Sequence, residues 1–251
     1  MAQQSGIIKL KGTLGGISFY KTSDGYLARE KGGVSAKRIA SDPAFQRTRE
    51  NNAEFSTAGK AGKLVRNALQ VLLQNAKDKR CVGRLTRVLL SVVKTDAGNA
   101  RGERKVQDGN MRFLHDFDFN ENGKLGSTFF TPFVSALDRT TGDLSLQIDS
   151  YQAAVRIAAP QGTTHYRLSL GGVELDFEER SFNFSMEQSA ILPHDTSEQP
   201  ASTLTANLNP ASTLPIVGVM GVEFFQEVNA EMYPLKNGSY NALAVVLVDQ
   251  V

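Results

Sequence analysis

One segment of the chain, DFNENGKLGSTF at 118–129, has the residue types of half a calcium-binding loop. Asp118, Asn120 and Asn122 place oxygen ligands at alternate positions, and a glycine follows where such a loop must turn. The second half of the pattern fails, because Phe129 stands where a bidentate glutamate is required and no long helical pattern flanks the loop. An Asn-Gly hairpin between the two apolar runs explains the same residues more simply, so we expect no metal site here.

Other motifs for catalysis or ligand binding also fail. The segment GKAGK at 59–63 lacks the spacing of a phosphate-binding loop, and no nucleotide-binding glycine motif follows a strand pattern. His115, His165 and His194 are scattered without metal-ligand spacing, and no motif of a serine or cysteine nucleophile is present. The single cysteine, Cys81, excludes an internal disulfide and suits a small buried side chain in a predicted helix. We therefore predict no catalytic residue, metal or cofactor, and a protein that is not an enzyme.

The charged residues are distributed very unevenly along the chain. Residues 1–105 contain 21 Lys and Arg but 8 Asp and Glu, a net charge of +13, whereas residues 106–251 contain 7 and 18, a net charge of −11. The net charge of the whole chain is only +2. Two oppositely charged halves attract each other within one molecule, between copies, or toward partners of the matching sign.

Many of the positive charges fall on predicted helices, which makes nucleic acid a possible partner. The candidate basic surface consists of Arg47, Arg49, Lys60, Lys63, Arg66, Arg80, Arg84 and Arg87, with Lys77 and Lys79 between them. Together they are enough to contact about half a dozen phosphates. These helices carry few aromatic residues for base stacking, and no DNA- or RNA-reading signature is present. The alternative is that the charges form a solvated face or meet the acidic half.

The N-terminal residues 1–40 have the pattern of a β-ribbon arm. Short apolar runs, IIKLKG, GISFY and GYLARE, are separated by glycine pairs and by SDG, and Asp24-Gly25 is a strong hairpin signal. A ribbon of two or three strands is marginally stable alone in water, so it must lie on another surface, either the sandwich or helices of its own chain or a neighbouring copy.

A basic helical hairpin is predicted over residues 41–95. Asp42 and Pro43 are a favourable N-cap and first helical residue. From residue 44 to about 76, and again from about 79 to 94, apolar residues recur at helical spacing. Phe45 and Phe55 belong to the predicted apolar face of the first helix.

Residues 96–110 are polar and glycine-containing, which is typical of a linker or long loop. Beyond them, residues 111–251 predict an acidic antiparallel β-sandwich. The expected strands are LSLQI (144–148), AAVRIAA (153–159), HYRLSL (165–170), VELDF (173–177), SFNFSM (181–186), STLTANL (202–208), PIVGVMGVEFFQEV (215–228) and NALAVVLV (241–248). A turn is expected at Gly171-Gly172, and a terminal hairpin with Asn237-Gly238 in a type I′ turn. The predicted fold class is therefore α+β.

No segment has the roughly 18 uninterrupted apolar residues that a membrane helix needs. The start, MAQQSGIIKLKG, lacks a positive region followed by an apolar core of about seven residues, so we expect no secretory signal peptide. We expect a cytoplasmic location and no membrane insertion, with membership of a virion or an injection apparatus left open.

Two long segments resemble the ends of a family of uncharacterised proteins in Bacteroidota genomes. They are GTLGGISFYKTSDGYLAREKGGVSAKRIASDPAFQRTREN (12–51) and VEFFQEVNAEMYPLKNGSYNALAVVLV (222–248). The resemblance covers most of the chain. It implies that the two halves belong together, and no activity, cofactor or site residue.

The leading hypothesis is a structural protein that self-assembles head-to-tail into a ring or filament. The arm adds a strand to a neighbouring copy, and the oppositely charged halves of adjacent copies attract each other. The expected self-assembly residues are Leu14, Ile17, Phe19, Tyr20, Tyr26 and Leu27. The alternatives are a nucleic-acid-binding protein, a sandwich that recognises glycan or peptide, and an enzyme whose site is assembled from distant positions.

Overall fold

Four short strands form the first sheet of the computed structural model, which describes residues 2–22, 24–30 and 32–250. The strands lie in the order β1 (Ala2–Gln3), β4 (Gly25–Glu30), β3 (Ile17–Thr22) and β2 (Gly12–Leu14), and all neighbours are antiparallel. The hairpin predicted at Asp24-Gly25 is confirmed by the pairing of β3 with β4, although Ser23 lies outside the described residues.

The strand expected at IIKLKG is wrong, because residues 7–11 form no strand. Strands β1 and β2 form the two edges of the sheet. The Ile7 and Ile8 side chains lie in solvent, 101% and 81% exposed.

The helical region begins earlier than the sequence predicts, because residues 36–41 already form a short helix in a segment expected to belong mostly to the β-ribbon arm. The elements are α1 (Ala36–Ser41), the 3-10 helix η1 (Pro43–Phe45), α2 (Gln46–Ala68), α3 (Gln70–Leu73) and α4 (Cys81–Thr95). The Asp42 carboxylate accepts a hydrogen bond from the Ala44 N–H at 2.9 Å, which is the expected N-cap, and Pro43 follows it.

The helices bury the apolar stripes that predicted them. Leu64, Val65, Leu69, Leu85 and Leu89 are all buried. Phe55, which was expected on the same face, is instead 59% exposed and contributes nothing to the core.

The remaining strands belong to the second half of the chain. They are β5 (Phe133–Asp138), β6 (Asp143–Ile148), β7 (Tyr151–Gln152), β8 (His165–Asp176), β9 (Ser181–Gln188), β10 (Leu192–Pro193), β11 (Glu198–Gln199), β12 (Ser202–Asn207), β13 (Ile216–Val228), β14 (Glu231–Pro234) and β15 (Ala242–Asp249). Short helical turns interrupt them: η2 (Met111–Leu114), α5 (Leu125–Thr128), α6 (Ala153–Arg156) and η3 (Leu235–Gly238). The predicted α+β class, with an antiparallel sandwich, is confirmed.

A curled six-stranded sheet is the centre of this region. β8 and β13 pair along most of their lengths, β9 and β10 pair with β8, and β14 and β15 both pair with β13. A second sheet contains β12, β6 and β5, and a two-stranded sheet contains β11 and β7.

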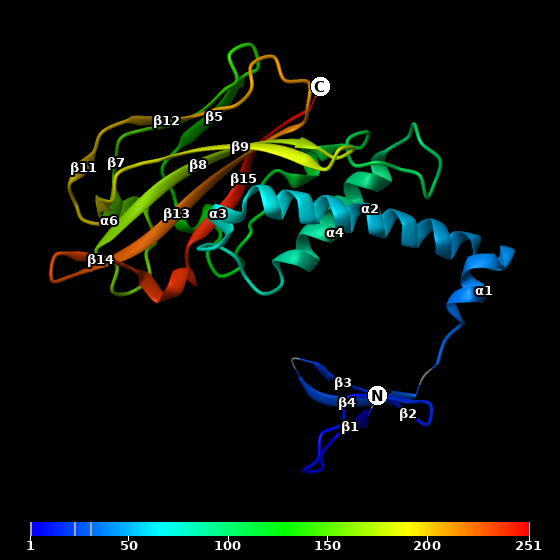
Figure 1. Ribbon diagram of the computed structural model, residues 1–251. Helices are drawn as coiled ribbons and strands as arrows, with labels where there is room; N and C mark the ends of the chain where they lie inside the picture. The colour runs from blue at the N-terminus through cyan, green and yellow to red at the C-terminus, as the bar shows by residue number, and fades with distance from the viewer. Residues whose placement is uncertain (1, 23, 31, 251) are drawn as a thin grey trace. The chain divides into compact units, whose positions relative to one another are not determined.

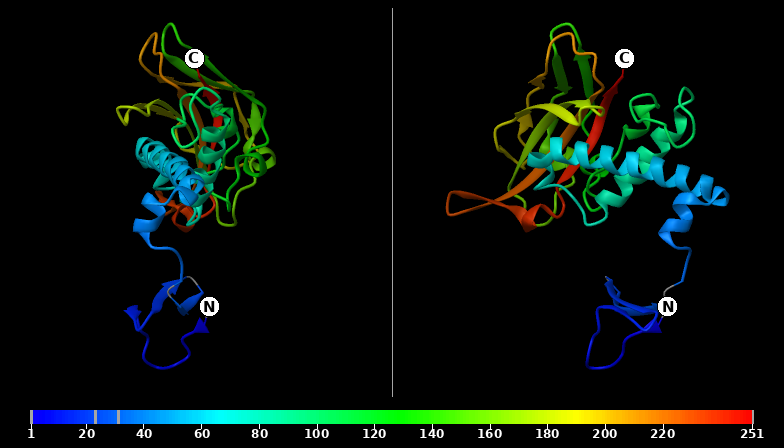
Figure 2. Two further views of the ribbon diagram at one scale, coloured as in Figure 1. Left: turned by 90° about the vertical axis from the view of Figure 1, so that its right-hand side faces the viewer. Right: turned by 45° about the vertical axis from the view of Figure 1, so that its right-hand side comes forward.

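Both faces of the central strands are buried. On one face Val173, Leu175 and Val219 share a core with helices α2, α3 and α4, and on the other Leu168 and Met220 share a core with β6 and β12. Successive strand residues point to opposite faces, so a run of apolar residues in a strand fills two cores at once. The result is three layers: helices, curled sheet and small sheet (Figure 1, Figure 2).

Three expected elements of the sandwich are wrong. AAVRIAA contains the helical turn α6 instead of a strand. Gly171-Gly172 does not turn, because β8 runs straight through it; a Cβ on Gly171 would lie 2.7 Å from Leu72 Cδ1, so the glycine admits the helix layer. The terminal hairpin is absent, because β14 and β15 each pair with β13. The type I′ conformation occurs instead at Asn229 and Ala230, with φ of 53° and 63°.

The chain divides into two compact units, Met1–Arg49 and Glu50–Val251. The helices from residue 50 onward share the core of the second unit with the curled sheet. Residues 96–110, expected as a linker or long loop, form a loop held to this same unit, and Val106 within them is buried.

Asp96 is the anchor of that loop. Its buried carboxylate accepts hydrogen bonds from the backbone N–H groups of Gly98, Asn99 and Lys105 and from the Asn99 side chain, at 2.8–3.0 Å. Burial alone would raise the pKa of Asp96, but these hydrogen bonds outweigh it and lower the pKa to about 2.

We expect Asp96→Asn to lower the free energy of unfolding at pH 7 by about 1–3 kcal/mol, because an amide replaces an acceptor of charge-assisted hydrogen bonds. The native pKa lies below the unfolded value of about 3.9, so the carboxylate stabilises the fold above that pH and loses its effect as pH falls toward 2. Urea unfolding of both proteins at pH 7, 4 and 2.5 measures this. A difference that stays constant with pH would contradict the assignment.

Candidate functional site

The N-terminal sheet presents apolar side chains on both faces without a core of its own. Strand register places Leu14, Ile17, Phe19 and Tyr26 on one face, and Tyr20 and Leu27 on the other. No described residue of 1–49 is buried, and the Leu14 and Ile17 side chains are 71% and 42% exposed. All six expected self-assembly residues therefore lie in one small sheet with an unfilled apolar surface.

Cations flank the aromatic rings of this sheet. The Lys21 ammonium lies 5.5 Å from the Tyr26 ring centroid on the face with Leu14, and the Arg29 guanidinium lies 5.5 Å from the Tyr20 ring on the opposite face. Each pair is a cation–π contact, which fixes the position of the charge beside the apolar surface. The faces are therefore both apolar and positive.

The eight residues of the candidate basic surface divide into two groups. The first holds the fold together. Arg49 donates to the carbonyl oxygens of Ile39 and Asp42, both at 2.8 Å, and Arg66 donates to the Gly62 carbonyl at 3.0 Å. Arg47 also has a contact within the chain.

Arg84 is the most heavily engaged of the eight. Its guanidinium donates to the carbonyl oxygens of Asp118 and Phe119 and forms ion pairs with Asp78 and Glu121. It also lies 5.2 Å from the Phe117 ring centroid. Arg84 therefore fastens α4 to the segment that begins at Phe117, and it is not available to a partner.

The second group has exposed side chains. Lys60 and Lys63 lie on α2, Arg87 lies on α4, and Arg80 lies just before α4. Across the described part of the chain, none of these four side chains has an ion pair or hydrogen bond. These four remain as candidates for contact with an external anion.

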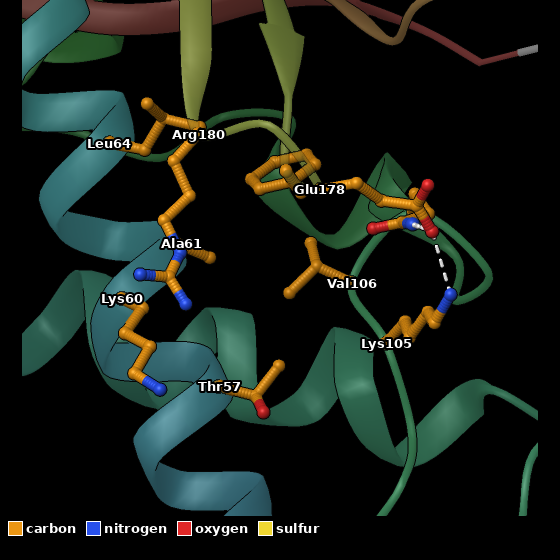
Figure 3. Close-up of a pocket in the computed structure, with 10 residues that line it drawn as sticks. Thr57, Lys60, Ala61, Leu64, Lys105, Val106, Glu178 and Arg180 are labelled. Atoms are coloured by element: carbon orange, nitrogen blue, oxygen red, sulfur yellow. Dashed lines mark hydrogen bonds and ion pairs between the residues drawn. The ribbon is translucent and has the colours of Figure 1, made fainter.

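Lys60 also lines a pocket of about 320 Å³ in the second unit. The pocket lies between α2, the loop at 105–107 and the turn between β8 and β9. Its apolar lining is Ala61, Leu64, Val106 and Phe177, and its polar lining is Thr57, Lys60, Lys105, Gln107, Glu178 and Arg180 (Figure 3).

The charges of this pocket do not cancel. Lys105 forms an ion pair with Glu178 at 2.6 Å, and Gln107 donates to the same carboxylate at 2.8 Å. Arg180 and Lys60 have no such partner in the described residues, and Figure 3 shows the Arg180 side chain extending along α2 toward Lys60. Two unpaired cations therefore lie beside one apolar wall.

The turn between β8 and β9 positions Arg180. The Asp176 carboxylate accepts the backbone N–H groups of Glu178 and Glu179, both at 2.9 Å, and closes the turn. Arg180 then adopts φ of 55°, in the left-handed region that few non-glycine residues occupy. Sequence reasoning missed Arg180 and Lys105, because 120 residues separate Lys60 from Arg180 and only the fold joins them.

The candidate calcium loop has a structural role. Asn120 is buried and donates to the carbonyl oxygens of Ser239 and Asn241, and Asp118 accepts the Leu125 N–H. The predicted Asn-Gly hairpin is wrong. The backbones of Phe117 and Phe119 form hydrogen bonds with β15, and the helical turn α5 follows instead of a returning strand. Among the described residues, no group of three His, Cys, Asp or Glu side chains is placed to hold a metal ion.

Comparison with protein-family models, with curated proteins and with solved structures finds no match. The comparisons therefore assign no activity, ligand or site residue to this chain. No helix in the described part of the chain has the length and apolar character needed to cross a bilayer.

We expect Arg84→Ala to destabilise the protein by about 2–4 kcal/mol, because it removes the donor to the Asp118 and Phe119 carbonyl oxygens and the cation that pairs with Asp78. Arg87→Ala, one turn away on the same helix, is the matched control and should change the unfolding free energy by less than about 0.5 kcal/mol. Thermal and urea unfolding measure both. Equal effects of the two substitutions would contradict the distinction between the two groups.

Proposed function

We propose that this chain is a non-enzymatic structural protein that self-associates head-to-tail through its basic N-terminal arm and the acidic body of a neighbouring copy. The observation that carries the proposal is the N-terminal sheet, in which no described residue is buried. A sheet without a core of its own gains little from folding alone. Its apolar faces require a cover.

Charge favours a second copy as that cover. Residues 1–49 contain 9 Lys and Arg and 3 Asp and Glu, a net charge of +6, whereas the second unit, residues 50–251, contains 19 and 23, a net charge of −4. Across the described residues, the ion pairs that join 1–105 to 106–251 are Arg84–Glu121 and Lys105–Glu178. The basic helices offset part of the acidic charge within the second unit, and the two units keep net charges of opposite sign, which favours attraction between copies.

The contribution of the helices to this association is narrower than their charge suggests. Their apolar faces are buried against the curled sheet, and Arg49, Arg66 and Arg84 are engaged within the chain. The proposal therefore rests on the arm and on the exposed cations Lys60, Lys63, Arg80 and Arg87.

We expect the molar mass measured by light scattering to rise with protein concentration and to fall as salt is added, because opposite charges are screened. Leu14→Glu with Ile17→Glu should abolish the rise, since both place a carboxylate on the exposed apolar face. Ala36→Glu with Ala40→Glu is the control, because both residues are exposed on α1 and lie outside the sheet. A full-length protein that stays monomeric at every concentration would overturn the proposed function.

Nucleic-acid binding is the second candidate, and the four exposed, unpartnered cations favour it. It predicts retention on a phosphate polymer at low salt. Lys63→Glu, Arg80→Glu and Arg87→Glu together should then weaken the binding. The slope of log affinity against log salt concentration should become shallower by about one for each phosphate contact that is lost. Arg84 is left unchanged in this test because of its structural role. The absence of retention in low salt would exclude this candidate.

A further inference from the structure

The pocket at Lys60 and Arg180 has the chemistry to bind a carboxylate carried on an apolar body. Its two unpaired cations lie at the rim, while Ala61, Leu64 and Phe177 provide an apolar wall. An inorganic anion would satisfy the charge and leave that wall in water. A peptide segment with acidic and apolar side chains together would cover both.

One segment of the chain has this composition and projects from the body. Residues 226–234, the end of β13, the turn and β14, are all exposed. The pairing of Val228 with Glu231 and of Gln226 with Tyr233 places the Glu231 carboxylate on the same face as the Val228 and Tyr233 side chains, which are 45% and 52% exposed. Figure 1 shows β14 extending beyond the other strands of its sheet. We call residues 226–234 the acidic hairpin.

This hairpin is held in one shape. Four residue pairs join β13 to β14, from Phe225–Pro234 to Val228–Glu231, and the turn has both residues in the left-handed region. The Glu227 N–H also donates to the Thr164 hydroxyl at 2.7 Å. A preordered segment loses little conformational entropy when it binds.

The pocket and the acidic hairpin lie at opposite ends of the same strand. His165, the first residue of β8, pairs with Phe225 at the base of the hairpin, and Asp176, its last residue, opens the turn that carries Arg180. Twelve residues of strand span about 40 Å, so the two surfaces of one copy cannot meet each other. A contact between them must join two copies.

We propose that the acidic hairpin of one copy docks in the Lys60–Arg180 pocket of the next, with the Glu231 carboxylate facing the two cations and Val228 and Tyr233 facing the apolar wall. This contact rests on the proposed self-association and identifies a specific pair of surfaces for it. Because the surfaces differ and lie at opposite ends of the body, the contact is heterologous, and it repeats into a filament unless its rotation closes a ring.

Charge exchange tests this contact in the full-length chain. Lys60→Glu with Arg180→Glu, and separately Glu231→Lys, should each lower the weight-average mass at least twofold under conditions in which the unchanged protein assembles. All three changes in one chain should restore the mass, because the attraction is re-formed with reversed sign. Lys77→Glu with Lys79→Glu is the control, since these residues are exposed and do not line the pocket.

The outcomes separate this contact from the proposed function. A monomeric unchanged protein overturns both. An assembling protein whose mass responds to Leu14→Glu with Ile17→Glu, and not to the changes in the pocket or hairpin, overturns the contact alone. So does a triple variant that stays dissociated although its melting temperature matches that of the unchanged protein. Orthophosphate binding at Lys60 and Arg180, with no effect of the hairpin changes on mass, assigns the pocket to a free anion and also overturns the contact.

Discussion

The double burial of β8, β13 and β15 is the constraint on which the architecture depends. Val217 and Val219 face the helices while Met220 and Val222 face the small sheet, so two cores share one set of strands. Neither the helices nor the small sheet would have a buried face without them. This arrangement also commits the apolar faces of the basic helices, which leaves only their outer cations for other contacts.

The two units of the chain differ in how much of their apolar surface is buried. The second unit fills both cores, and even its polar loop at 96–110 is tied down by Asp96. The first unit has regular strands and well-placed turns, yet no described residue in it is buried. Backbone pairing alone therefore defines its sheet, and its apolar side chains remain available for an intermolecular contact.

Capping and turn residues in the sequence predicted the ends of those helices and strands that depend on neighbouring residues alone. Asp42 and Pro43 predicted the start of η1, which leads into α2, and Asp24-Gly25 predicted a hairpin, because capping and turn geometry involve only neighbouring residues. Asn237-Gly238 failed as a hairpin, since the edge of β13 accepts both β14 and β15 and this pairing is decided by distant residues. Gly171 was misread for a related reason: the need for a glycine there comes from Leu72, a hundred residues away. The arm was visible in its apolar pattern, whereas the pocket was not, because Lys60 and Arg180 become neighbours only through tertiary packing.

The unbroken course of β8 through its paired glycines has a mechanical consequence. Tension applied between the two ends of this strand acts parallel to it and perpendicular to the hydrogen bonds that join it to β13. In that geometry all ten residue pairs bear load together and must slide at once, whereas a sheet pulled from one corner would open one pair at a time. A strand turning at Gly171-Gly172 would have divided this load path. The continuous pairing of β8 with β13 should therefore resist extension along the strand direction more than separation that starts from one end.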